Sequence, residues 1–375
     1  MEKIITISNV SELKRNMATL SRNVVPSALD KGELVAWYEK GCLLIYASGS
    51  GNVGYFWTNI EEKDASPAYL FPQALFTQVV NVLPEDKPAT FTFRSDAILC
   101  IRSGEDMRFD IRIGASKDKP KVEVPPALTE FDLPMDVLKN VQKKVLPCAV
   151  TSATSTTPFV GLIAKDGTVT VNATDNYTLA RMQLPVTAGK EFAVATSPTA
   201  WKIAFPENDN GLAHFRVTDR FVIVSGKRYS YLVANHMSGM PPYESITSRC
   251  AAYPTTVSVE KGKLMEAMKA IEIMATAVSN ILEVRFHKES FTLYTEDKEM
   301  GHIQMDVPYA SEKATELDGK RVGFSYDFFV KGINASPEHV VLNLADPTNQ
   351  NFGISPVEFV TSDGSVMVVS PVRVE

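Results

Sequence analysis

The 375-residue sequence carries one order of predicted helices and strands three times. Each copy opens with a short alternating strand that runs directly into an amphipathic helix. The opening residues Ile4, Phe131 and Val257 are 127 and 126 residues apart. A second helix is predicted in each copy, at 71–83, 197–205 and 326–335. An internal repeat dictates the architecture of a chain, so this period of about 125 residues limits the fold to three copies of one module.

The pattern inside each copy indicates an α+β fold. On the first helix, Leu13, Met17 and Leu20 recur at intervals of three or four residues, which places them on one helical face. A meander of alternating strands follows each second helix, as half-buried sheet requires. The meanders lie within 90–113, 214–233 and 340–372. We predict three similar α+β domains, at 1–127, 128–253 and 254–375. The alternative is chance spacing in an ordinary α+β protein.

The composition is that of a soluble globular protein and excludes a polycation. Lys and Arg number 38 against 44 Asp and Glu, which gives a net charge of −6, and 45% of the residues are hydrophobic. No apolar run reaches the length of a membrane span, and MEKIITISNV lacks the regions of a secretory signal. The four cysteines are scattered, which fits reduced thiols. We therefore expect a cytoplasmic protein.

The candidate catalytic motifs lack the flanking residues or spacing that their functions require. The segment 49–54 (GSGNVG) has the letters of a dinucleotide-binding fingerprint, but the strand-like run YFWT follows it, where a helix is required. We predict a glycine-rich hairpin turn there. None of the five histidines has zinc-site spacing, and the sequence has no P-loop and no G-x-S-x-G. We expect no enzymatic activity, no cofactor and no metal site.

The predicted helices are basic within an acidic chain. The six helical windows hold 11 Lys and Arg against six Asp and Glu, so the rest of the chain carries a net charge of −11. A common space lined by such helices would attract a phosphate backbone without reading base sequence. The alternative is the ordinary abundance of lysine on helix surfaces. The candidate DNA-binding residues are Lys14, Arg15, Arg22, Lys139, Lys143, Lys144, Lys202, Lys263, Lys269 and Lys331.

Three segments resemble the bacterial DNA polymerase III beta subunit, the DNA sliding clamp family. Residues 171–180 (VNATDNYTLA) are similar to the family's V-x-A-T-D-G-H-R-L-A segment. Residues 240–246 (MPPYESI) are similar to its F-P-D-Y-x-R-V/I segment, and 368–374 (VVSPVRV) to its V-V-M-P-M/V-R-L terminus. The threefold layout also matches that of the family, so the resemblance covers the whole length, as expected of a divergent member.

The resemblance implies a processivity factor without chemistry of its own. Two chains would close head to tail into a ring, in which each domain has antiparallel sheets outside and two helices inside. The helices would line a hole around double-stranded DNA, bound without sequence preference. The ring would tether the replicative DNA polymerase, and a clamp loader would place it on DNA. The alternatives are a clamp-like scaffold for protein partners that is not loaded on DNA, and an unrecognised enzyme or structural β-rich protein.

The resemblance also implies a pocket between the second and third domains for peptides with Gln and Leu/Phe-type anchors. Its apolar residues and few hydroxyls suit such anchors, although they could equally be ordinary core residues. The matching positions are Phe159, Thr174, Tyr177, Leu179, Pro241, Ile246, Phe328, Val368, Ser370, Pro371 and Val372. The family's G-H-R is Asn176-Tyr177-Thr178 here, Ser370 replaces its terminal Met, and Ser245 replaces an Arg. We therefore expect an altered pocket and an unusual partner motif.

The implied dimer interface joins the first domain of one chain to the third domain of the other. The family's positions fall near Phe109 and Ile111 on an edge strand, and near Ile273 and Met274 on the first helix of the third copy. Apolar side chains there would form a sealed contact. The alternative is that they belong to the core of their own chain.

Overall fold

The structure is a computed structural model that describes 2–26, 32–116, 118–121, 123–149, 160–198, 201, 211–235, 241–275, 280–361 and 364–374. The chain divides into two compact units. The first comprises Met1–Leu138 and Val186–His236. The second comprises Lys139–Pro185 and Met237–Glu375.

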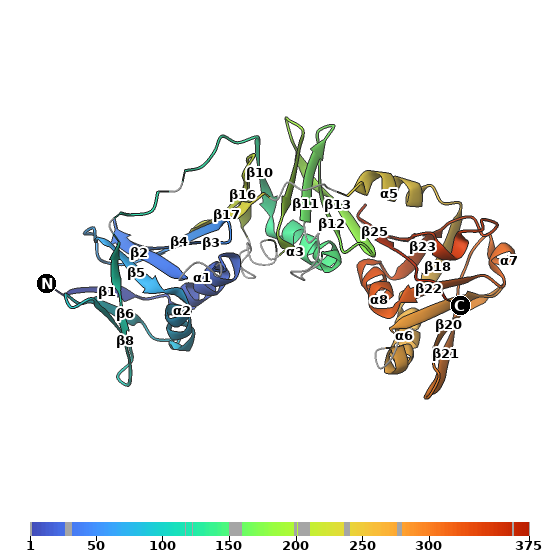
Figure 1. Ribbon diagram of the computed structural model, residues 1–375, viewed down its shortest axis with the longest axis horizontal. Helices are drawn as coiled ribbons and strands as arrows, with labels where there is room; N and C mark the ends of the chain where they lie inside the picture. The colour runs from blue at the N-terminus through green and yellow to red at the C-terminus, as the bar shows by residue number, and fades with distance from the viewer. Residues whose placement is uncertain are drawn as a thin grey trace. The chain divides into compact units, whose positions relative to one another are not determined.

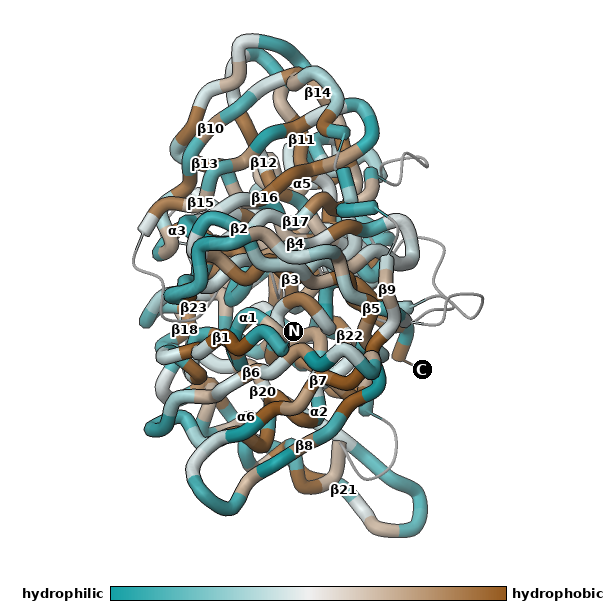
Figure 2. Tube along the Cα trace, turned by 90° about the vertical axis from the view of Figure 1, so that its left-hand side faces the viewer, coloured by the Kyte–Doolittle hydropathy of each residue, from teal (hydrophilic) through white to brown (hydrophobic). Residues whose placement is uncertain are grey.

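The first unit contains two antiparallel sheets. Its strands are β1 (Lys3–Ile7), β2 (Glu33–Glu39), β3 (Cys42–Gly49), β4 (Asn52–Asn59), β5 (Ala68–Pro72), β6 (Ala89–Phe93), β7 (Ile98–Ser103), β8 (Met107–Arg112), β9 (Gly114–Ser116), β10 (Thr129–Pro134), β14 (Phe192–Thr196), β15 (Leu212–Val217), β16 (Phe221–Ser225) and β17 (Tyr229–Ala234). One sheet has the order β1-β6-β7-β8, and the other β10-β15-β16-β17-β4-β3-β2-β5-β9. In the four-stranded sheet, buried and half-buried residues alternate along β6, and hydrophobic and hydrophilic residues alternate along β8 (Figure 2), as one buried face requires.

Two helices of the first unit, α1 (Val10–Asn23) and α2 (Gln73–Val82), pack against each other and cover its core (Figure 1). The Asn9 Oδ1 accepts the Glu12 N–H at 3.0 Å, so a side chain caps the start of α1. Its apolar stripe, which includes Leu13, Met17 and Leu20, is fully buried. The sheet pairing of Tyr231 on β17 with Gly54 on β4 joins the first and second predicted repeats directly.

The second unit repeats this plan with its own sheets. Its strands are β11 (Val160–Lys165), β12 (Thr168–Thr174), β13 (Thr178–Thr187), β18 (Thr255–Glu260), β19 (Ile281–Phe286), β20 (Ser290–Asp297), β21 (Gly301–Pro308), β22 (Arg321–Ser325), β23 (His339–Leu344), β24 (Val357–Val360) and β25 (Val366–Val369). The strands that lie within this unit follow the order β11-β12-β13-β25-β24-β23-β18 in one sheet and β21-β20-β19-β22 in the other. The helical elements are α3 (Met135–Lys144), which starts in the first unit, η1 (Leu146–Cys148), α5 (Tyr243–Ala251), α6 (Lys261–Ala275), α7 (Ala314–Leu317), α8 (Tyr326–Ala335) and η2 (Phe352–Ile354).

The α+β class and five of the six predicted helices are confirmed, as α1, α2, α3, α6 and α8. The sixth, at 197–205, falls largely outside the described residues. The glycine-rich segment is the turn between β3 and β4, with Ser50 and Gly51 at positive φ of 51° and 81°, so the hairpin prediction is also confirmed. Helix α5 was not predicted, because its sequence was interpreted as part of a motif and a linker.

Gly332 in α8 marks a close approach of that helix to the sheet. A Cβ at this position would lie 2.7 Å from the ring of Phe359, which is fully buried on β24. We expect Gly332→Ala to lower the free energy of unfolding by about 1–3 kcal/mol, because the overpacking outweighs the helix-propensity gain of alanine. Urea unfolding monitored by circular dichroism measures this change.

The matched control for that variant is Gly262→Ala in the first turn of α6, where the nearest atom to a new Cβ is 3.7 Å away. This variant should be neutral or slightly stabilising, since it gains helix propensity without a clash. Equal unfolding midpoints for the two variants would contradict the close approach in α8.

Candidate functional site

The centre of the site is the pairing of β13 with β25, two strands far apart in sequence. Thr178 lies opposite Val369, and Leu179 opposite Val368. The Tyr177 carbonyl oxygen accepts the Ser370 N–H at 2.7 Å and extends the ladder by one step. This register places the two segments that carried the family resemblance, 171–180 and 368–374, side by side.

Helix α5 brings the third resembling segment to the same strands. Tyr243 and Cys250 form a buried cluster with Leu179 and Val368, and Ile246 packs against this cluster while remaining half-buried. Burial in the cluster raises the pKa of Tyr243 to about 12. Tyr243 was not among the predicted pocket residues. Its spacing of about one helical turn from Ile246 is the signal that could have placed both residues on one helix face.

A tight turn before β13 presents Tyr177 to solvent. The Asp175 Oδ1 accepts the N–H groups of Tyr177 at 3.1 Å and Thr178 at 2.5 Å. The Thr174 hydroxyl donates to the Thr178 carbonyl at 2.7 Å and accepts the Asn176 N–H at 3.1 Å. Asn176, at a φ of 73°, adopts the left-handed conformation that asparagine tolerates. The turn is therefore fixed on both sides while the Tyr177 side chain stays 56% exposed.

The exposed ring of Tyr177 stacks on Phe328 of α8, with centroids 5.4 Å apart and planes 19° apart. The Lys331 Nζ lies 4.9 Å from the Phe328 ring centroid and 3.0 Å from the Asp175 Oδ2. Lys331, a predicted DNA contact, is thus held beside the aromatic pair by an acidic partner whose side chain is only 10% exposed. The sequence analysis did not single out Asp175, which organises both the turn and this ion pair.

The chain after β25 closes the remaining edge of the site. The Val372 N–H donates to the Gly323 carbonyl at 2.9 Å, while Ser370, Pro371 and Val372 are half-buried. Pro241 is also half-buried, and Phe159 lies outside the described residues. Together the described pocket residues offer an apolar floor next to an exposed aromatic pair, which suits insertion of an apolar side chain.

The helix lysines differ in what they contact. Lys14 reaches Glu85 at 3.5 Å, and Lys263 reaches Glu260 at 2.9 Å. Lys144 and Lys331 are half-buried, the other described candidates on the helices are exposed, and Lys202 lies outside the described residues. The exposed ones are Arg15, Arg22, Lys139, Lys143 and Lys269.

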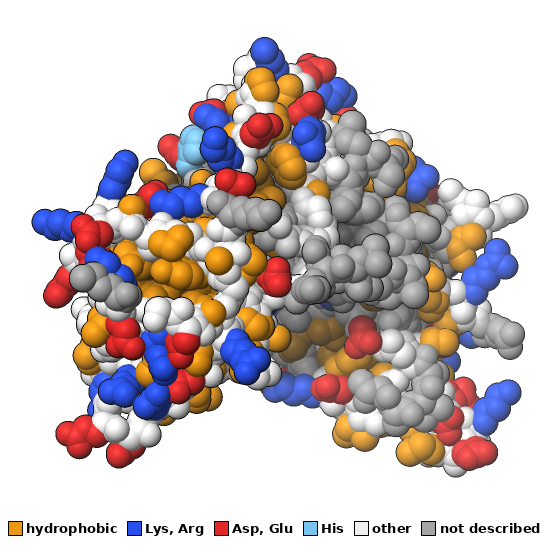
Figure 3. Space-filling model, turned by 60° about the vertical axis from the view of Figure 1, so that its left-hand side comes forward, with side chains coloured by type: hydrophobic (Ala, Val, Ile, Leu, Met, Phe, Trp, Pro, Cys, Tyr) orange, Lys and Arg blue, Asp and Glu red, His pale blue; other side chains and the backbone are white. Residues whose placement is uncertain are grey.

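A further lysine, Lys261, was not among the predicted DNA-binding residues. It opens α6, and its Nζ donates to the Ser336 carbonyl at 2.6 Å, just past the end of α8. Burial, aided by the nearby Lys143 ammonium, lowers the pKa of Lys261. On the face drawn in Figure 3, Lys and Arg are interspersed with Asp and Glu.

The predicted dimer residues separate into exposed and buried ones. β8 is an edge strand of its sheet, with Phe109 half-buried and Ile111 at 2% exposure in the core of its own chain. On α6, Ile273 is 72% exposed whereas its neighbour Met274 is buried. Ile273 thus presents apolar surface outward, while Ile111 and Met274 are buried and Phe109 packs, partly buried, against the core of its own chain.

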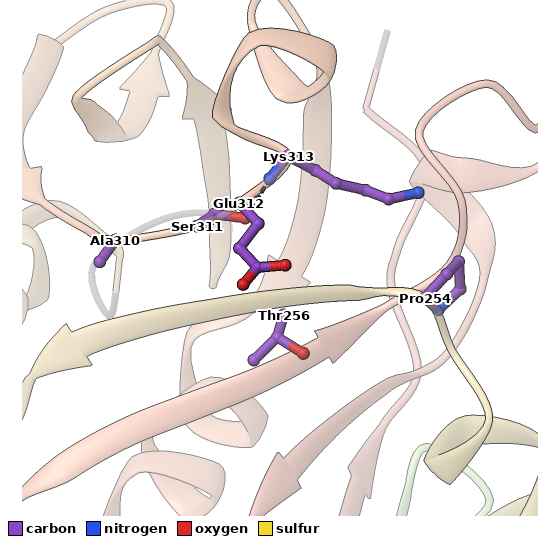
Figure 4. A pocket seen from close by; sticks show the side chains of 6 residues that line it. All are labelled: Pro254, Thr256, Ala310, Ser311, Glu312 and Lys313. Atoms are coloured by element: carbon purple, nitrogen blue, oxygen red, sulfur yellow. Dashed lines mark hydrogen bonds between the residues drawn. The ribbon is translucent and has the colours of Figure 1, made fainter.

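Other parts of the described chain offer little chemistry. A cavity of about 560 Å³ between the start of β18 and the loop after β21 is lined by six residues, with Glu312 drawn toward Thr256 (Figure 4), and contains none of the predicted positions. Burial raises the pKa of the Cys148 thiol to about 12, so this thiol is protonated near neutral pH and is a poor nucleophile. Among the described residues there is no group of three or more His, Cys, Asp or Glu that could hold a metal ion. No described helix has both the length and the apolar character needed to cross a membrane.

No family sequence model matches the chain, and no curated protein matches it in sequence. Its structure is similar to the DNA polymerase III beta subunit of Thermotoga maritima, at 18% identity and a TM-score of 0.85 over 100% of both chains. It is also similar to the sliding clamp of Pseudomonas aeruginosa, at 16% identity and a TM-score of 0.82 over 99% of this chain and 100% of that one. The beta chain of Streptococcus pneumoniae gives 14% identity and 0.82 over both full chains.

These likenesses extend over the full length and define the fold class: the chain has the DNA-clamp fold. Within that class its structural neighbours are bacterial DNA polymerase III beta subunits, so the resemblance found in the three local segments is confirmed at the level of the fold. Identities of 14–18% account for the absence of a sequence match.

Proposed function

We propose that this protein is a DNA polymerase processivity factor, a sliding clamp without enzymatic activity. The observation that carries the proposal is the full-length likeness to beta-subunit clamps at TM-scores of 0.82–0.85. Two copies, each built from three domains at 1–127, 128–253 and 254–375, would close into a ring around duplex DNA. Exposed Lys139 and Lys143 on α3 support loose phosphate contacts, which permit sliding because they read no base sequence.

The site around β13, β25 and α5 would serve as the attachment point for the polymerase and the clamp loader. Its buried apolar cluster and exposed Tyr177–Phe328 stack favour a short peptide with apolar anchors. The same site would also serve a scaffold that binds protein partners but is never loaded on DNA. Retention on circular DNA separates these two functions.

Encirclement gives a topological result that simple phosphate binding does not. Loaded onto a nicked circular plasmid, the protein should remain bound through gel filtration and be lost once the circle is linearised. Equal loss from both forms would exclude the clamp and leave the scaffold.

The helix lysines are tested in the same assay with Lys139→Glu and Lys143→Glu combined. Each charge reversal removes one phosphate contact and adds a repulsion, so we expect retention on the circle to fall at least tenfold and to depend more steeply on salt. The matched control is Lys298→Glu with Lys288→Glu, on the strand connections of the second unit. Unchanged retention in the α3 variant would contradict the placement of these lysines at the DNA.

A further inference from the structure

A second, polar pocket of about 310 Å³ lies between the β11–β12–β13 face and the start of α5. Its strand residues alternate along the chain, as in Thr170 and Asn172 on β12 or Arg181 and Gln183 on β13, so they share one face of the sheet. Nothing in the sequence motifs or in the proposed function accounts for this pocket, whose volume is within the range of ligand sites.

The floor of the pocket contains a buried amide with an unmet hydrogen bond. Asn172 has no solvent exposure, and its Nδ2 donates to the Thr170 hydroxyl at 3.0 Å. Its Oδ1 has no hydrogen-bond partner within the described structure. Leaving a buried carbonyl oxygen without a donor is destabilising, and such a group in a native protein calls for an explanation. A ligand N–H at this point would satisfy it.

The charges around the pocket favour a neutral ligand. The Lys165 ammonium and the Glu244 carboxylate pair at 2.8 Å at the rim, each more than half exposed. Arg181 reaches the Thr247 hydroxyl of α5 only at a long 3.4 Å, and Asp166 balances its charge within the pocket. Two positive and two negative groups select neither an anion nor a cation. A neutral group with both an N–H and a carbonyl matches the Asn172 acceptor and the Arg181 donor.

The polar pocket adjoins the candidate peptide site. Arg181 follows Leu179 by two residues, so both side chains leave the same face of β13. Tyr243 packs on Leu179 in the buried cluster and also lines the polar pocket. The two sites therefore share Tyr243 and one face of β13, so the polar pocket is next to a peptide anchored over Leu179 and Val368.

We propose that the pocket binds a backbone amide of the partner peptide beyond its apolar anchor. The peptide N–H donates to the Asn172 Oδ1, and its carbonyl oxygen accepts from the Arg181 guanidinium. This inference rests on the proposed peptide-binding function and adds a contact that is independent of peptide side chains. It predicts that a partner peptide binds more tightly when its chain extends beyond the anchor, whatever the sequence of the extension.

The test compares three labelled peptides on the full-length protein by fluorescence anisotropy. The first has acetyl and amide caps and carries Gln and a Leu/Phe anchor, and the second adds three glycines at either end. The third replaces these glycines with sarcosine, which keeps the carbonyl but has no backbone N–H. Glycine at one of the two ends should tighten the Kd at least about fivefold, which is the effect of one net hydrogen bond. Sarcosine should give a smaller gain, because it keeps the carbonyl contact with Arg181 but has no N–H for Asn172.

Two variants assign the gain to the pocket. Asn172→Leu, similar in shape to asparagine, should leave the Kd of the anchor peptide unchanged and reduce the glycine gain to that of sarcosine. Arg181→Met should also reduce the glycine gain. Because Arg181 is half-buried, this variant tests the pocket even if Asn172→Leu fails to fold. No gain from glycine, an equal gain from sarcosine, or a gain that persists undiminished in both variants would overturn the inference. If the anchor peptide itself does not bind, the peptide-binding function fails and the inference fails with it.

Discussion

Ile273→Asp should convert the proposed head-to-tail dimer into a monomer. Sedimentation of the wild type at micromolar concentration should give about twice the 41.3 kDa chain mass, whereas the variant should sediment near 41.3 kDa. The side chain is 72% exposed on α6, so the chain should fold normally. In a sealed apolar interface, an unpaired carboxylate would cost several kcal/mol, which weakens association at least about a thousandfold.

The matched control is Ile354→Asp, the same substitution at an isoleucine that is 46% exposed in η2. It should leave the mass of the dimer unchanged. A wild-type protein that sediments as a monomer, or an Ile273→Asp variant that remains dimeric, would contradict the head-to-tail ring at this helix.

Removing the exposed aromatic pair should have the second largest effect. We expect Tyr177→Ala with Phe328→Ala to weaken binding of the Gln and Leu/Phe anchor peptide about a hundredfold, since loss of both anchor rings together should cost about 3 kcal/mol. The costs of two rings in contact are not additive. Fluorescence anisotropy against the full-length protein measures the change. The stack has one exposed and one half-buried member, so folding should be largely retained.

The chain offers a matched pair for comparison in Tyr55 and Trp57 of β4, whose rings stack at 6.3 Å in the first unit. Alanine at both positions should leave peptide binding unchanged. Equal losses in the two double variants would show that the effect is a general loss of stability. Unchanged binding after loss of Tyr177 and Phe328 would remove the aromatic pair from the site.

The sequence predicted the elements whose pattern is local. The spacing of Leu13, Met17 and Leu20 is enough to define α1, because a helix with one buried face must repeat its apolar residues near every 3.6 positions. Helix α5 has no such clear stripe. Its buried residues Tyr243 and Cys250 acquire their partners only when β13 pairs with β25, and local periodicity does not report that pairing.

The site residues show the same division between local and non-local information. The family segments identified Leu179 and Val368, which the structure places opposite each other. The charge count placed Lys331 with the DNA-binding candidates, but Asp175 binds it from 156 residues away. Ile273 and Met274 are neighbours in sequence and differ in burial because successive residues of a helix point about 100° apart.

The nine-stranded sheet has a consequence for how such a chain can be shortened. β17 is the hydrogen-bonded neighbour of β4. Truncating the chain near residue 127 would therefore leave β4 as an unpaired edge strand, which could pair with a strand of another molecule. The three copies therefore cannot be added or removed independently of one another. Loss or gain of one copy would leave a sheet edge without its neighbour, and new residues would have to cover that edge. The number of copies is thus linked to the pairing of strands between them.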